Sequence, residues 1–238
     1  MGTVINCLGI IAGGILGMLC GSHFSKGMQD TLMKADGAAV LFIGIAGALS
    51  RMFVIQDGMI STQGSMMMIL SLALGAVIGE LLDLSGKLEK FGTWLKVKSG
   101  NAKDAQFVNA FVDASLTVCI GAMAVVGAIE DGVNHDVSIL ASKAVLDFII
   151  ILCMSASMGK GCLFSFIPVG IFQGVITLLA AMLASGVSDA AMNNLSLVGS
   201  VLIFCVGVNL IFGRKINVAN LLPSLVFAVL FSFLNFTL

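Results

Sequence analysis

The sequence has few charged residues. Asp, Glu, Lys and Arg make up only 11% of its 238 residues, whereas soluble domains carry about 25%. So few charges cannot cover a water-facing surface, and 58% of the residues are hydrophobic, with a mean hydropathy of +1.09. The composition therefore excludes an ordinary soluble domain and predicts an integral membrane protein. The net charge of −1 gives no electrostatic basis for a nucleic-acid partner.

Familiar site motifs are also lacking. The six cysteines form no C-x-x-C pair, so the sequence predicts neither a zinc site nor a disulfide framework. It contains no phosphate-binding loop, no H-E-x-x-H and no G-x-S-x-G motif. We therefore expect no cofactor, no metal site and no enzymatic activity. No basic residue precedes the first apolar run, which is predicted to be a retained span because a cleaved signal would have a positive start.

Apolar stretches long enough to span a bilayer, about 20 residues each, occur eight times. They are residues 3–21, 37–55, 66–85, 107–128, 139–158, 163–185, 195–212 and 218–237. The predicted fold is an all-α polytopic membrane protein with one integral membrane domain, residues 1–238. Residues 86–106 place apolar residues three and four apart between lysines, which predicts a short helix in the lipid headgroup layer. A plain solvated linker is the alternative.

Basic residues indicate the orientation. Ten of the twelve Lys and Arg residues fall in loops on one side of the predicted spans. Because Lys- and Arg-rich loops stay in the cytoplasm, both termini are predicted outside and residues 86–106 inside. The alternation also favours an even number of spans.

Glycine recurs every fourth residue in the first and third predicted spans. These glycines are Gly9, Gly13, Gly17 and Gly21, followed by Gly75 and Gly79. Small residues at this spacing predict close helix packing, either within the protomer or in a homo-oligomer. A shift of 161 residues aligns Gly9 and Gly13 with Gly170 and Gly174. It relates the first two spans to the sixth and seventh, which predicts an inverted repeat of the kind found in transporters.

The fourth and fifth predicted spans carry ionisable residues. Asp113 shares a helical face with Asn109 and Thr117, and Asp147 follows Lys143 by one turn. Such residues inside a span are costly and indicate a functional site by default. We interpret the five as a polar pathway, in which the carboxylates hold a proton or cation and Lys143 is a counter-charge or gate. A purely structural Lys143–Asp147 pair is the alternative.

Four further polar residues are candidates. Gln173 and Asn209 are amides inside the sixth and seventh spans, where interhelical hydrogen bonding is the default role and substrate contact the alternative. Glu130 and Asp131 close the fourth span on the predicted outer side. They form either an acidic vestibule that attracts cations or an ordinary loop.

Three runs resemble a known family: GAMAVVGAIEDG (121–132), ILASKAVLDF (139–148) and MGKGCLFSFIPVGIFQGVITLLA (158–180). The chain resembles, over nearly its whole length, the bacterial inner-membrane family called domain of unknown function 554, the YqgA- and YdfK-like proteins. The resemblance implies a bacterial cytoplasmic membrane and a transporter-like protein. The family has no established activity, so it supplies no site residues. Asp113 is the candidate that the resemblance supports least.

Together these patterns predict a transporter of a small solute or ion, coupled to protons or cations, whose other partner is the lipid bilayer. One alternative is a non-transporting sensor, scaffold or partner subunit that docks through residues 86–106. A more distant one is an intramembrane enzyme, because aspartyl proteases of the membrane also place two aspartates on neighbouring spans. Neither Asp113 nor Asp147 follows the G-x-G sequence of those enzymes.

Overall fold

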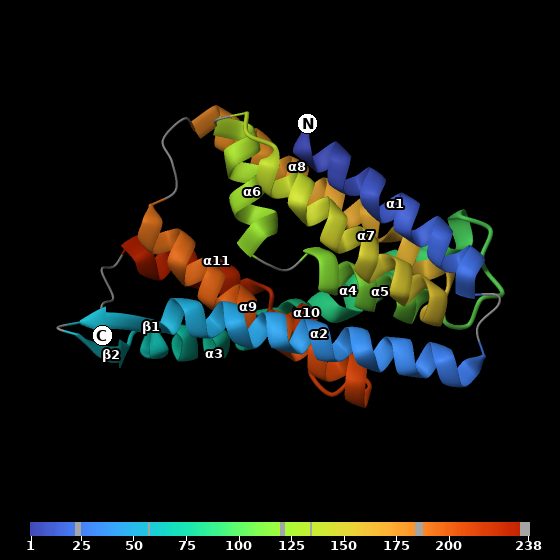
Figure 1. The fold of residues 1–238 in the computed structure, drawn as a ribbon, viewed down its shortest axis with the longest axis horizontal. Helices are drawn as coiled ribbons and strands as arrows, with labels where there is room; N and C mark the ends of the chain where they lie inside the picture. The colour runs from blue at the N-terminus through green and yellow to red at the C-terminus, as the bar shows by residue number, and fades with distance from the viewer. Residues whose placement is uncertain (22–24, 57, 120–121, 134, 184–187, 234–238) are drawn as a thin grey trace. The chain divides into compact units, whose positions relative to one another are not determined.

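The chain is almost entirely helical in a computed structural model that describes residues 1–21, 25–56, 58–119, 122–133, 135–183 and 188–233 (Figure 1). It divides into two compact units. Unit 1 comprises residues 1–37 and 86–186, and unit 2 comprises residues 38–85 and 187–238. Each unit combines an early and a late part of the sequence.

Unit 1 is a bundle of helices. Its elements are α1 (Gly2–Gly21), the first part of α2 (Lys26–Met52), most of α4 (Leu84–Lys98), α5 (Phe107–Cys119), α6 (Ala122–Val133), α7 (Ser138–Met158), the 3-10 helix η1 (Lys160–Ser165) and α8 (Phe166–Leu183). α1 packs along the length of α7 and also contacts α8 (Figure 1). α6 packs against α8, and α5 packs against η1.

Unit 2 contains helices and a short hairpin. Its elements are the rest of α2, β1 (Phe53–Gln56), β2 (Met59–Thr62), α3 (Ser65–Leu82), α9 (Asp189–Phe212), α10 (Val218–Leu221) and α11 (Pro223–Phe233). The two strands are antiparallel, with Phe53 opposite Thr62. α11 packs against α3 and α9. Buried Met67, Leu197, Val198 and Ala228 form an apolar cluster there.

The structure confirms an all-α polytopic membrane fold. Six helical segments among the described residues are long and apolar enough to cross a membrane. They are α1, α2, α3, α7, α9 and the continuous segment of η1 and α8 from Lys160 to Leu178. α5 and α6 together make a seventh if the bent pair is one span, and residues 218–233 form a shorter apolar helical segment.

The span predicted at 107–128 is wrong as one straight helix. α5 ends at Cys119, and the axes of α5 and α6 differ by 75°. The hydroxyls of Ser115 and Thr117 donate to the carbonyls of Phe111 and Asp113, four residues earlier. Such bonds draw on the carbonyls that hold the helix together and favour bending. The sequence therefore contains a local cause for ending α5 near Cys119.

Two other predicted spans differ from the observed helices. The span predicted at 37–55 ends at Met52, because the β-branched and aromatic run from Phe53 favours a strand. The segment predicted at 218–237 is divided before Pro223, whose missing N–H cannot continue the helix. Residues 86–106 contain most of α4, whose Gly92 and Leu95 are buried while Trp94 is exposed. Its position in a headgroup layer stays a prediction.

The predicted glycine faces lie against helices of the same unit. A Cβ built on Gly13 would lie 2.4 Å from the Phe148 carbonyl oxygen, and one on Gly17 would lie 2.3 Å from that of Leu152. Gly9 and Gly21 meet the carbonyls of Ala144 and Ala156 in the same way. In unit 2, Gly75 meets the backbone of Ser224 and Gly79 that of Asn220. These glycines therefore bring helix backbones together inside each unit.

Candidate functional site

A buried ion pair lies at the middle of α7. The Lys143 Nζ is 2.7 Å from the Asp147 Oδ1, and the two side chains are only 8% and 3% exposed. Both residues lie on the α7 face that also carries buried Leu140, Ala144 and Ile151. A buried pair is costly to desolvate, and removing one partner leaves an uncompensated charge. Replacing either Lys143 or Asp147 alone is therefore expected to destabilise the folded protein.

Two buried amides from other helices lie close to this pair. Asn6 of α1 and Gln173 of α8 are both fully buried, and the Asn6 Nδ2 donates to the Gln173 Oε1 at 3.3 Å. Asn6 is also near the Asp147 carboxylate. The close contact between Gly9 and the Ala144 backbone brings α1 onto α7, which explains why an α1 amide reaches an α7 carboxylate.

Several polar atoms of this region are buried without a hydrogen-bond partner among the described residues. They are Asp147 Oδ2, Asn6 Oδ1, Gln173 Nε2, Thr3 Oγ1 and Thr177 Oγ1. Leaving a buried polar group unpaired costs about 1–3 kcal/mol, so native proteins pair nearly all of them. Asn6 lies near the Asp147 carboxylate and bonds to Gln173, so three of these atoms belong to residues in or beside one ion pair, which indicates a region suited to bind a polar ligand. We define the polar cluster as Lys143, Asp147, Asn6 and Gln173.

The break between α5 and α6 adjoins the polar cluster. Cys119, the last residue of α5, lies within electrostatic range of Lys143 and Asp147. The carboxyl end of a helix carries a partial negative charge from its free carbonyls, which favours a neighbouring ammonium. Helices interrupted within the membrane supply such ends to the ion sites of transporters.

The remaining residues of the predicted pathway have other surroundings. Asn109 is exposed, Asp113 is half-buried and Thr117 is buried. The Thr117 hydroxyl donates to the Asp113 carbonyl of its own helix at 2.7 Å. The four-residue spacing of Asp113 and Thr117 therefore places them for a hydrogen bond within α5. A part for Asn109, Asp113 and Thr117 in a pathway stays a prediction.

Asn209 has a structural role at the end of α9. Its Oδ1 accepts hydrogen bonds from the backbone N–H groups of Lys215 and Ile216, and its Nδ2 donates to the Ile216 carbonyl at 2.7 Å. These three bonds hold the loop that follows the helix. They engage both ends of the side-chain amide, and a part for Asn209 in a substrate pathway stays a prediction.

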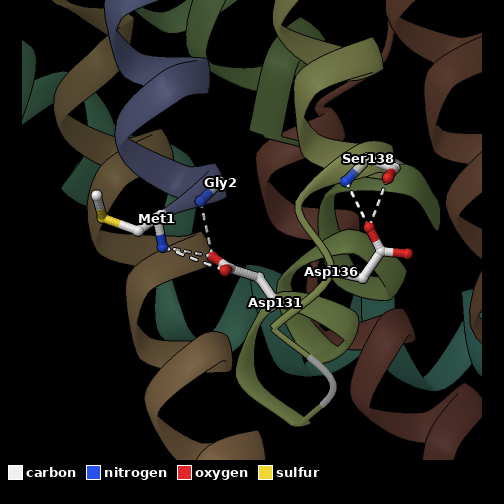
Figure 2. A network of polar contacts seen from close by, with 5 residues as sticks. All are labelled: Met1, Gly2, Asp131, Asp136 and Ser138. Carbon is white, nitrogen blue, oxygen red and sulfur yellow. Dashed lines mark hydrogen bonds and ion pairs between the residues drawn. The ribbon is translucent and has the colours of Figure 1, made fainter.

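The two predicted vestibule carboxylates are not alike. Asp131 is covered, with a side chain only 4% exposed, and its carboxylate accepts from the Met1 amine at 3.0 and 3.1 Å and from the Gly2 N–H at 2.9 Å (Figure 2). Glu130 is half-buried. Asp131 therefore fastens α1 to α6 and does not face an open vestibule, because α1 covers it.

Asp136 is the exposed carboxylate of this region. The hydroxyl and backbone N–H of Ser138 both donate to its Oδ1 (Figure 2). These two hydrogen bonds lower the pKa of Asp136, since they stabilise the charged form. Asp136 thus closes a local turn just before α7 begins at Ser138.

The sequence interpretation did not consider Thr3 and Thr177, and it treated Asn6 as an amide similar to Gln173, with interhelical hydrogen bonding as the default role. A signal for them existed, because Thr3 and Asn6 are three residues apart and Gln173 and Thr177 are four apart, so each pair shares a helical face. Which face points inward depends on helix packing, which the spacing does not give. Among the residues that the structure describes, no three His, Cys, Asp or Glu side chains gather as a metal site.

Comparisons with known proteins identify a family without an assigned activity. The model of the family described as "Protein of unknown function (DUF554)" matches residues 1–233. The chain is 28% identical over 224 residues to "Uncharacterized membrane protein YdfK" of Bacillus subtilis (strain 168), which covers 94% of this chain and 92% of the relative. It is 25% identical over 233 residues to "Uncharacterized protein YqgA" of Escherichia coli (strain K12), at 96% and 94% coverage. No solved structure matches.

Proposed function

Because this chain belongs to the DUF554 family of unknown function, we propose its function from its own polar cluster: it moves a small solute or ion across the membrane. The observation that carries the proposal is the Lys143–Asp147 pair inside a helix long and apolar enough to span a membrane, with Asp147 Oδ2 lacking a hydrogen-bond partner among the described residues. An ionisable group in that place is expensive and is expected to take part in function.

The surroundings of the pair support a role in transport. α1, α7 and α8 each direct buried polar atoms without hydrogen-bond partners, among the described residues, into unit 1. A passing solute or ion that pairs with these atoms removes the cost of leaving them unbonded. The broken α5–α6 segment resembles the discontinuous helices that line substrate sites in transporters. The proposal assigns no enzymatic step and no nucleic-acid partner.

The location and orientation belong to the same proposal. Relatives from two bacteria, one of them described as a membrane protein, support a bacterial cytoplasmic membrane. The side-specific lysines support termini outside and α4 inside. A homo-oligomer would have to use a surface other than the glycine faces, because these already contact helices of the same unit. The inverted repeat stays a prediction.

A flux screen tests the proposal. The purified protein is placed in proteoliposomes, and uptake and efflux of small solutes and ions are measured for wild type and Asp147→Asn. We expect protein-dependent flux of at least one substrate and a loss of about tenfold or more in Asp147→Asn, since the charge is removed from the pathway. Circular dichroism and gel filtration confirm that the variant folds.

The chain offers a matched control. Asp30 and Lys34 form an ion pair with the same four-residue spacing, 2.6 Å between Nζ and Oδ2, but both side chains are about half exposed. Asp30→Asn is expected to leave the flux unchanged. Equal flux in wild type and Asp147→Asn, or no protein-dependent flux for any compound, contradicts the proposal.

The closed geometry of the ion pair favours a second candidate function. A buried pair with 2.7 Å between its charged atoms can be a purely structural link, as in a non-transporting sensor, scaffold or partner subunit. α4 would then be the docking surface, because Lys87, Lys90 and Lys98 are exposed on it. In that case these three Lys→Gln changes should release a co-purifying partner, and Asp147→Asn should affect stability alone.

A further inference from the structure

We propose that Asp147 binds a monovalent cation, either a proton or a metal ion, in direct competition with the Lys143 ammonium. The inference deepens the proposed function and rests on it for its role in transport, because it names the substrate class and the competitor at the same site. The binding itself is a property of the polar cluster that can be measured without any flux.

The free atoms of the polar cluster favour a cation. Lys143 occupies Oδ1 of the carboxylate, and Oδ2 is buried without a hydrogen-bond partner among the described residues. Asn6, which lies near the same carboxylate, donates one N–H of its Nδ2 to Gln173, and its Oδ1 is a second buried acceptor without a hydrogen-bond partner among the described residues. Two oxygen acceptors, one of them anionic, suit a proton or a small hard cation. An anion would meet the Asp147 charge at close range.

Charge balance makes Lys143 the competitor. The pair is neutral as it stands, and a cation added beside it leaves an unpaired positive charge in a low-dielectric site, which is strongly disfavoured. A monovalent cation that takes the place of the ammonium keeps one positive and one negative charge in the site when Lys143 releases its proton to solvent in the same exchange. A divalent ion would leave a surplus even after the ammonium has moved away. The site therefore selects single positive charges.

The titratable groups near Asp147 are few. Lys143 lies on the same helix, and Cys7 of α1 and Cys119 at the end of α5 lie within electrostatic range of the carboxylate. α8 contributes the neutral amide of Gln173, which meets Asn6. On α6, Asp131 is paired with the Met1 amine. Removal of Lys143 therefore removes the one opposite charge that forms an ion pair with Asp147 among the described residues.

Removing the competitor gives a directional test. In Lys143→Met the buried carboxylate lacks its counter-charge, so a bound cation becomes the stabilising partner of the folded state. A ligand that binds only the folded state at 100 times its Kd stabilises by about 2.7 kcal/mol, which corresponds to a rise of about 5–10 °C in Tm for a chain of this length. Tm is measured in detergent with increasing NaCl or KCl against choline chloride, and separately with falling pH in choline chloride.

The expected pattern is specific. Lys143→Met should gain about 5 °C or more with a metal cation or with protons, and the two arms tell which of them binds. Lys143→Met combined with Asp147→Asn should not respond, and neither should Lys34→Met, whose pair is exposed. The proposal is overturned if the Tm of Lys143→Met changes neither with added NaCl or KCl nor with falling pH, or if it changes only as the Tm of the double variant does.

Infrared difference spectra of wild type give an answer even if Lys143→Met does not fold. Exchange of choline for Na⁺ or K⁺, or a step in pH, should shift a carboxylate stretching band that is absent in Asp147→Asn. An unchanged band in wild type contradicts cation binding. Cation binding without any flux would support this inference and refute the transport proposal. Flux without any effect of cations on Tm or spectra would support transport and refute this inference.

Discussion

Replacing Gly13 by Ala tests whether the α1 and α7 backbones really touch. The new Cβ would lie 2.4 Å from the Phe148 carbonyl oxygen, against 3.4 Å or more for an ordinary contact. The colliding atom belongs to the helix backbone, so a side-chain rotation cannot relieve the clash. The helices must separate locally by about 1 Å, and overpacking of this kind costs about 1–3 kcal/mol.

Gly174 provides the matched control for this substitution. It also lies inside an apolar helix, α8, but a Cβ built on it meets nothing within 4 Å. Because Ala is the better helix former, Gly174→Ala should be neutral or stabilise by up to about 1 kcal/mol. The same chemical change is thus expected to have opposite effects at two positions of unit 1.

Equilibrium unfolding in mixed SDS and dodecylmaltoside micelles, followed by circular dichroism, measures both free energies of unfolding. Gly17→Ala, where the Cβ would lie 2.3 Å from the Leu152 carbonyl oxygen, should repeat the loss seen at Gly13. If Gly13→Ala and Gly174→Ala unfold with the same free energy, the close approach of α1 and α7 is refuted. The polar cluster would then lose the contact that brings Asn6 to α7.

Two further predictions concern polar groups outside the polar cluster. Asn209→Ala should destabilise the protein by about 1–3 kcal/mol in the same unfolding assay, because part-buried partners of its amide lose their hydrogen bonds. It should leave any flux unchanged, and a selective loss of flux would assign Asn209 to the pathway. Ser138→Ala should raise the pKa of Asp136 toward its ordinary value, measured by carboxyl NMR titration. Since Asp136 has a lowered pKa in the folded state, its stabilising contribution is present above about pH 4 and is lost as the pH falls through the folded value. An Asp136 pKa that Ser138→Ala leaves unchanged contradicts this account.

The sequence predicted local features of this protein well. The four-residue spacing of Lys143 and Asp147 predicted a pair on one helical face, and the structure places the two charged atoms 2.7 Å apart. The repeated glycines of α1 predicted a flat packing face, which the structure shows against α7. Both features follow from the period of a single helix, so no knowledge of neighbouring helices was needed.

Features that join distant parts of the chain could not be predicted in this way. The Asn6–Gln173 bond links residues 167 positions apart, and no helical period connects them. Asn209 looked like an inward-facing amide, yet its partners are the backbone groups of the next loop. Asp131 looked like an open acidic group, but the start of α1 covers it. For Asn6 and Asp131 the partner is set by tertiary packing, which a single apolar sequence specifies only weakly, whereas the partner of Asn209 is set by the path of the loop that follows α9.

The β1–β2 hairpin has a consequence for how deeply unit 2 lies in the bilayer. The outer edges of a two-stranded sheet carry unpaired N–H and C=O groups, which the hydrocarbon region cannot accommodate. Its Ile55 and Ile60 side chains are 80% and 75% exposed, so the hairpin suits the boundary where lipid headgroups begin. Just before it, Arg51 bonds to Asn193 near the start of α9 at 2.7 Å. We therefore expect the hairpin to lie at the membrane boundary and to limit how deeply α2, α3 and α9 enter the bilayer.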